Sequence, residues 1–232
     1  MKGKSSFYYR ALVCSAAIMV LAVAVRAEQP GAAIMTNMAG NARQLKQYTF
    51  KQRVETYYQS ELKNAKTAEV HYSPNGERIV IPLDEQSATQ ADHRRRGPGA
   101  RLIAKKIESK QIETKEYVQR LMFLTDRYLS SDPTKLQSAM QAADITRKGS
   151  TGQINVAMRN YVKDGDSMTM SFDSATNRPT ETVITTSLDD DDVVIVLTFD
   201  QIHQGPSYPV KTVVRAEAKQ LEVRVFTYEY RL

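Results

Sequence analysis

The sequence lacks tryptophan, and its single cysteine, Cys14, lies in an uncharged apolar run at residues 11–25. Basic residues precede this run, and Val25 and Ala27 supply the small side chains that a signal peptidase requires. We therefore expect residues 1–27 to be a signal peptide, with an uncleaved N-terminal anchor as the alternative. An exported chain without this segment would contain no thiol, which excludes disulfide bonds and thiolate metal sites.

A strong net charge is also absent once this segment is set aside. The whole chain carries 32 basic and 26 acidic residues, a net charge of +6. Four of the basic residues and none of the acidic ones lie in the segment, so 28 basic and 26 acidic residues leave a net charge of +2. The basic isoelectric point therefore belongs partly to the signal peptide, and we expect no nucleic-acid partner.

The sequence contains no common catalytic or nucleotide-binding motif. Gly-x-Ser-x-Gly, His-Glu-x-x-His and phosphate-loop patterns are all missing. The three histidines, His71, His93 and His203, do not have the spacing of metal ligands. The acidic run at residues 189–192 lacks the alternation and the glycine of a calcium loop, so we interpret it as a hairpin turn. We therefore predict a protein that is not an enzyme and that holds neither a metal nor a cofactor.

The sequence does contain many short segments with strand-like patterns. Three precede residue 84, at residues 47–59, 67–72 and 78–83, and six follow residue 152, at residues 153–161, 167–172, 180–186, 193–199, 210–216 and 221–230. Turn signals join them at short and regular spacing, and β-branched and aromatic residues are enriched within them. This arrangement predicts hairpins and therefore an antiparallel sheet of about nine strands.

Helical patterns lie before and between these strands. Residues 32–45 and 101–129 carry apolar residues at three- and four-residue steps, and Pro133 begins a further helix that extends to residue 143. The order of strands, helices and strands predicts an α+β domain in which helices cover one face of a curved antiparallel sheet.

Every second residue of the C-terminal strands is apolar, so one face of the sheet is apolar. This set of residues includes Ile154, Val156, Met158, Met168, Met170 and Phe172. This face is either a filled core, as in most sheets, or an apolar groove that two short helices leave partly open. In the second case these residues, with Leu121 and Leu124 of the long helix, would bind the ligand, and the methionines would suit an adaptable lining. Apolar residues change parity at Phe226, which indicates a β-bulge or a strand end that is covered on both sides.

Three motifs of the C-terminal half occur in a fixed order. An Asp-x-x-Thr-x-x-Pro turn spans residues 173–179, an apolar strand follows at residues 193–199, and Tyr208-Pro209 begins the next strand. These motifs resemble those of outer-membrane lipoprotein-sorting proteins, the LolA/LolB-like periplasmic carriers. The first helix, followed by Tyr48-Thr49-Phe50, is also similar to the opening of that family. The family fold is a half-open barrel of antiparallel strands with helices over its mouth, and its ligands are acyl chains.

The resemblance implies a single domain at residues 28–232, with a flexible Arg-rich linker and a helical insertion at residues 84–150. It also implies export to the periplasm of a Gram-negative-type bacterium and a hydrophobic ligand, either an acyl chain or a lipidated protein. Arg94, Arg95 and Arg96 of the linker would contact an anionic membrane surface, although an exposed loop explains them equally. The alternative function is a structural or protein-interaction module of the envelope, whose filled sheet takes no small-molecule ligand. The pattern leaves the oligomeric state open.

Overall fold

The computed structural model describes residues 30–84, 98–129, 133–149 and 152–232, with residues 98–112 described by their backbone alone. The predicted signal peptide at residues 1–27 lies outside these ranges, as do Arg94, Arg95 and Arg96.

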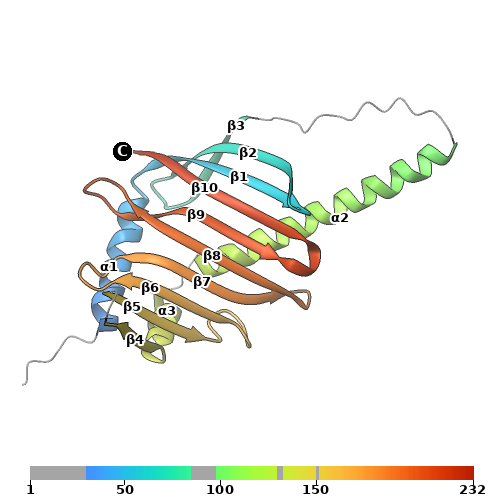
Figure 1. Ribbon diagram of the computed structural model, residues 1–232. Coiled ribbons are helices and arrows are strands. Elements are labelled where there is room, and N and C mark those ends of the chain that lie inside the picture. The colour runs from blue at the N-terminus through green and yellow to red at the C-terminus, as the bar shows by residue number, and fades with distance from the viewer. Residues whose placement is uncertain (1–29, 85–97, 130–132, 150–151) are drawn as a thin grey trace, which may run out of the picture.

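The described residues form ten strands that belong to one antiparallel sheet (Figure 1). The strands are β1 (Thr49–Tyr58), β2 (Glu61–Tyr72), β3 (Arg78–Asp84), β4 (Asp144–Lys148), β5 (Gln153–Arg159), β6 (Ser167–Asp173), β7 (Pro179–Leu188), β8 (Asp191–Gln201), β9 (Ser207–Ala216) and β10 (Leu221–Arg231). Their spatial order is β3-β2-β1-β10-β9-β8-β7-β6-β5-β4. The first hairpins therefore join the sheet by pairing with the last strand, and the described sheet is open, with β3 and β4 at its edges.

The antiparallel α+β prediction is confirmed, but two strand segments were missed. The second strand begins at Glu61 and not at residue 67, because Gln59 and Ser60 form a tight turn with φ angles of 52° and 65°. This turn contains no glycine, asparagine or proline to announce it. Strand β4 occupies residues that the sequence analysis left between a helix and the next strand. The predicted acidic turn is confirmed at Asp189 and Asp190, which connect β7 to β8 with positive φ angles, whereas Asp191 and Asp192 belong to β8.

All three α-helices pack on the same face of the sheet, which we call the helix-side face. They are α1 (Pro30–Leu45), α2 (Pro98–Leu129) and α3 (Pro133–Gln141), and a short 3-10 helix, η1 (Glu217–Lys219), connects β9 to β10. Ile34 of α1, Leu121 of α2 and Met140 of α3 belong to one buried cluster with sheet residues. Figure 1 shows α2 crossing behind the sheet and continuing past the ends of the strands. No helix among the described residues is long and apolar enough to cross a lipid bilayer.

The strand register explains why one side-chain parity is buried. Paired residues point to the same face of an antiparallel sheet, so the pairings define rows that run across it. One helix-side row comprises Val156, Met170, Thr182, Leu197, Thr212 and Val225, taken from β5 to β10. The opposite side of the sheet, which we call the outer face, carries the other parity. Val194 and Val196 of β8 are half-buried there, so this strand carries apolar side chains on both faces.

A β-bulge lies near the end of β10. The register between β1 and β10 shifts between Thr49 and Lys51, and Glu229 has a φ angle of 53°. The extra residue turns Tyr230 to the helix-side face, where its ring stacks on Phe50 at 4.8 Å between centroids. A bulge is therefore present, but it lies after Phe226 and Tyr228, which stay half-buried on the outer face, so it does not cause the change of parity that begins at Phe226.

Helix α1 is fixed to the sheet by one asparagine. The side-chain amide of Asn41 donates to the carbonyl oxygen of Ser207 at 2.7 Å, and its oxygen accepts from the Ser207 amide at 2.6 Å. This paired contact satisfies both backbone groups at the start of β9 as a neighbouring strand would.

Candidate functional site

All eight predicted groove residues lie together between the helices and the sheet. They belong to one buried cluster, and none is more than 5% exposed: Leu121, Leu124, Ile154, Val156, Met158, Met168, Met170 and Phe172. Strands β5 and β6 contribute six of them as three directly paired couples, and α2 contributes two. Since they are covered in this structure, a ligand can reach them only if a helix moves away from the sheet.

The C-terminal half of α2 forms most of this cover. Leu121, Leu124 and Tyr128 recur at three- and four-residue steps, and each is at most 5% exposed. Phe123 lies on the opposite side of the same helix and is 69% exposed. The helix is therefore amphipathic over the sheet.

A buried hydrogen-bond cluster, which we call the latch, fixes the end of α2. The hydroxyl of Tyr128 lies 2.7 Å from Asp166 Oδ2 and 2.8 Å from Thr186 Oγ1. Asp166 belongs to the loop before β6, whereas Thr186 belongs to β7, so the latch joins three separate segments. It is the most deeply buried group of polar contacts described for α2.

The carboxylate of Asp166 is stabilised in its ionised form. Burial alone would raise its pKa, but the Tyr128 hydroxyl and three backbone amides outweigh this effect and lower the pKa of Asp166. The amide donors belong to Tyr161, Val162 and Lys163, at 2.6 to 2.9 Å. Burial is also the main reason that the pKa of Tyr128 is raised, so its hydroxyl stays protonated as a donor.

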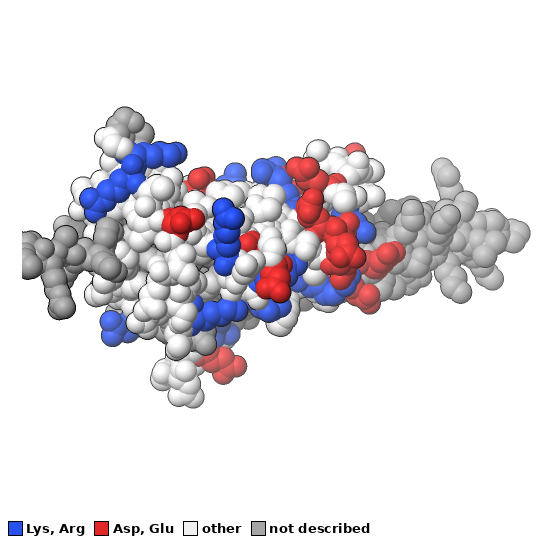
Figure 2. Space-filling view, turned by 90° about the horizontal axis from the view of Figure 1, so that it is seen from below, with Lys and Arg blue, Asp and Glu red and all other residues white. Residues whose placement is uncertain are grey.

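A second group of polar contacts holds the middle of α2 to the β7–β8 turn. Arg120 forms an ion pair with Asp189 at 2.5 Å, and the Tyr117 hydroxyl donates to Asp191 at 3.3 Å. Burial and the charge of Asp191 raise the pKa of Tyr117 to about 12. Figure 2 shows acidic side chains gathered towards the end of the molecule where α2 extends past the strands. The Arg120–Asp189 ion pair is about half exposed, so it contributes less than the buried latch, whereas Tyr117 is only 6% exposed.

One buried hydroxyl on the helix-side face is unsatisfied. Thr182 is 2% exposed, and its Oγ1 has no hydrogen-bond partner among the described residues. It stands in the row between Met170 and Leu197. A buried hydroxyl without a partner is costly, so this position would favour a polar group that could bond to it.

A separate hollow lies on the outer face, where β1, β9 and β10 end. Its volume is about 490 Å³, and it is open to solvent. Its walls are Tyr57, Gln59, Ser60, Arg215, Glu217, Gln220, Leu221, Glu222 and Arg224. We call it the outer hollow. It is on the opposite side of the sheet from the predicted groove.

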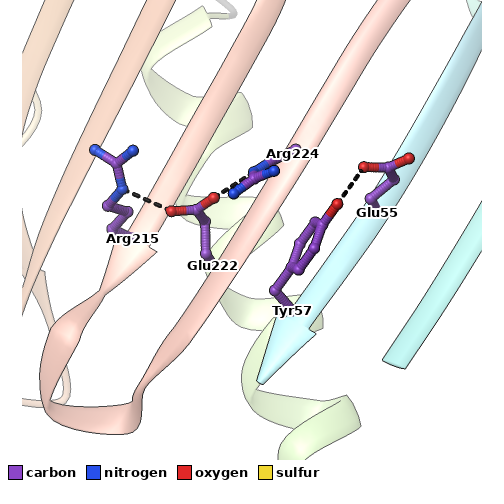
Figure 3. Close-up of polar contacts among 5 residues, drawn as sticks. All are labelled: Glu55, Tyr57, Arg215, Glu222 and Arg224. Carbon is purple, nitrogen blue, oxygen red and sulfur yellow. Dashed lines mark hydrogen bonds and ion pairs between the residues drawn. The ribbon is translucent and has the colours of Figure 1, made fainter. Parts of the chain in front are cut away.

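Charged side chains from three strands form a connected network at the outer hollow (Figure 3). Glu222 of β10 accepts from Nε of Arg215 in β9 at 2.7 Å and from Nε of Arg224 on its own strand. The Arg224 guanidinium lies 4.2 Å from the centre of the Tyr57 ring. The hydroxyl of Tyr57 donates to Glu55 at 2.8 Å in β1.

Both carboxylates of this network are held ionised. Burial opposes ionisation of Glu222, but the hydrogen bonds from Arg215 and Arg224 outweigh it and lower the pKa of Glu222. The same balance applies to Glu55, where hydrogen bonds from Tyr57 and Arg53 lower the carboxyl pKa. The network is therefore charged and ordered at neutral pH.

The outer hollow could not be identified from the sequence. Every second residue of the first strand is partly polar, and this set includes Glu55 and Tyr57. In the last strand, Glu222 and Arg224 lie on either side of an apolar residue. These patterns mark a solvent-facing side, but only the pairing of β1 with β10 brings the residues together.

Comparison with known proteins gives no assignment. No protein-family model matches the chain, and no curated protein matches it in sequence.

Proposed function

We propose that the protein is an exported carrier of the cell envelope that takes up a hydrophobic ligand on its helix-side face. The ligand class is an acyl chain or a lipidated protein segment, and the sheet acts as a half-open barrel with α2 as its movable cover. Residues 1–27 would direct the chain to the periplasm before this function begins.

The buried cluster that Leu121 and Leu124 of α2 share with the paired strands β5 and β6 supports this proposal most directly. Three methionines of these strands, Met158, Met168 and Met170, lie next to one another through the strand register. Thioether side chains are flexible and polarizable, so they can repack around an inserted chain. The unsatisfied Thr182 hydroxyl beside Met170 would offer a hydrogen bond to the polar end of such a ligand.

The second candidate function is a structural or protein-interaction module of the envelope. Its support is the packing of the same residues, since the side chains of Val156, Phe172 and Leu121 are fully buried within the protein. A filled core of this kind needs no occupant. The two functions differ in whether the cover opens.

Binding of a fluorescent fatty acid, 11-dansylundecanoic acid, tests the proposal. The chain without its signal peptide should bind this probe saturably, with enhanced dansyl emission, and native mass spectrometry should show one acyl ligand per chain. Replacing Met158, Met168 and Met170 together by leucine keeps the volume but removes flexibility, so affinity should fall several-fold.

Met122→Leu provides the matched control, because Met122 is a partly buried methionine on α2 outside the paired strands. Its affinity for the probe should equal that of the wild type. Absence of saturable binding by the wild type, together with a ligand-free mass after purification from membranes, would refute the carrier and favour the interaction module.

A further inference from the structure

The outer hollow has no part in the proposed carrier function, because the sheet separates it from the helices. Its walls are rich in hydrogen-bond donors that lack acceptors. Arg215 and Arg224 each use Nε for Glu222, and among the described residues their terminal nitrogens have no acceptor. Figure 3 shows the terminal nitrogens of Arg215 pointing away from Glu222. The hollow therefore presents unused guanidinium N–H groups.

Gln220 adds a further donor to the same wall. Its side-chain oxygen accepts from Gln59 Nε2 at 2.9 Å, which orients the amide and leaves Gln220 Nε2 without an acceptor among the residues described. Glu222, by contrast, already accepts from two guanidinium groups. The five donor nitrogens, two on each arginine and one on Gln220, outnumber the two oxygens of the Glu217 carboxylate, for which no hydrogen bond is described, so the complementary ligand is an acceptor such as an oxyanion.

The formal charges of the lining residues limit which oxyanion fits the outer hollow. The lining contains two arginines and two glutamates, Glu217 and Glu222, so its formal charges balance. Attraction to a highly charged anion is therefore weak, and recognition depends on the geometry of the N–H groups. A carboxylate carries one negative charge on two coplanar oxygens, which matches the planar fork of a guanidinium group.

The Tyr57 ring and the Leu62 side chain extend the hollow in one direction. The register places Arg215, Glu222, Tyr57 and Leu62 in one row across β9, β10, β1 and β2. Leu62 is 49% exposed at the end of this row. Three strand spacings separate it from Arg215, about 14 Å in total. From these observations we propose that the outer hollow binds a carboxylate that carries an extended apolar group.

The experiment is a titration of the chain without residues 1–27. NMR signals of the arginine Nε groups and the glutamine side-chain amides monitor binding. The probes are acetate, octanoate and N-acetylleucine at constant ionic strength, with N-acetylleucinamide as the ligand that lacks a carboxylate. Octanoate or N-acetylleucine should shift the signals of Gln220 and Arg215 and bind about tenfold more tightly than acetate, because part of the apolar group is buried. Tighter binding of octanoate identifies a fatty acid as the source, and tighter binding of N-acetylleucine identifies a peptide chain end.

A conservative variant separates N–H geometry from net charge. Arg215→Lys keeps the charge but removes the fork, so the affinity for the carboxylate probes should fall about tenfold. Arg147→Lys, at an exposed position of β4, is the matched control and should bind as the wild type does. Any octanoate bound on the helix-side face would be unaffected by Arg215→Lys, so this comparison also distinguishes the two sites. Unchanged affinity in Arg215→Lys, equal binding of the amide, or no saturable carboxylate binding would each overturn the proposal.

Discussion

At the scale of single residues, the burial of the groove side chains could be predicted from alternation, but the latch could not. Met168 and Phe172 share a parity with other apolar residues, so the pattern in one strand indicates that they are inside. Asp166 shows no such signal, because an acidic residue beside Gly165 is typical of an exposed turn. Its burial depends on Tyr128, which a different part of the chain supplies.

Asp166→Asn should destabilise the protein at neutral pH by about 2–3 kcal/mol, because it weakens hydrogen bonds to a buried charged group. The ordinary pKa of this carboxyl is 3.8, and the folded-state pKa is lower. The ionised form therefore contributes stability above pH 3.8, and this contribution is lost as the pH falls below 3.8 towards the folded-state value. Urea unfolding at pH 7 and pH 3 should show a smaller difference between variant and wild type at the lower pH.

The matched control is Asp164→Asn, because Asp164 is an exposed residue of the same turn. Its unfolding free energy should stay within about 0.5 kcal/mol of the wild type at both pH values. A pH-independent gap between Asp166→Asn and the wild type would contradict the role assigned to the ionised carboxylate.

At the scale of elements, strands with regular alternation were predictable and polar strand segments were not. The first half of β2 contains Glu61 and Lys63, whose side chains are exposed, so no burial pattern marks it. The same reason applies to β4, where only Ile145 is apolar and most side chains are exposed. Both segments are strands because a neighbouring strand supplies hydrogen-bond partners, and that information is not local.

Helix α2 should be held to the sheet mainly through its apolar stripe. Leu121→Ala leaves a cavity beneath the helix and should lower the unfolding free energy by about 3 kcal/mol. Phe123→Ala removes a larger side chain from the same helix, but Phe123 is 69% exposed, so the change should be under about 0.5 kcal/mol. Urea unfolding followed by circular dichroism compares the two variants directly, and equal losses would show that α2 is not packed as described.

At the scale of the whole molecule, the hairpins could be expected from the sequence, whereas the order of strands in the sheet could not. The junction of β1 with β10 unites the two ends of the chain, and the outer hollow exists only because of it. An open sheet also exposes backbone groups at its edges, where other chains can pair. Edge strand β3 is notably apolar, with Ile79, Val80 and Ile81 between 37% and 46% exposed.

Pro82 should limit pairing at this edge. The backbone amide of Ser73 donates to the carbonyl oxygen of Glu77 across the β2–β3 turn. Hydrogen-bonded and non-hydrogen-bonded pairs alternate along the hairpin, so the Pro82 nitrogen lies on the side of β3 away from β2. Since proline has no N–H group, an incoming strand lacks one donor there. Pro82→Val should therefore increase self-association, measured by light scattering during size-exclusion chromatography.

The control for this prediction is Pro82→Lys, which also restores the N–H group but adds a charge that opposes strand pairing. It should elute as the wild type does. If Pro82→Val behaved in the same way, protection of the β3 edge would have to come from something other than this proline.

The junction of β1 with β10 also has a consequence for biosynthesis. The segment made first, β1 to β3, has no place in the sheet until the segment made last, β10, leaves the ribosome. Contacts between such distant segments slow folding, because a long loop must close before they form. The sheet therefore cannot be completed until β10 has been synthesised.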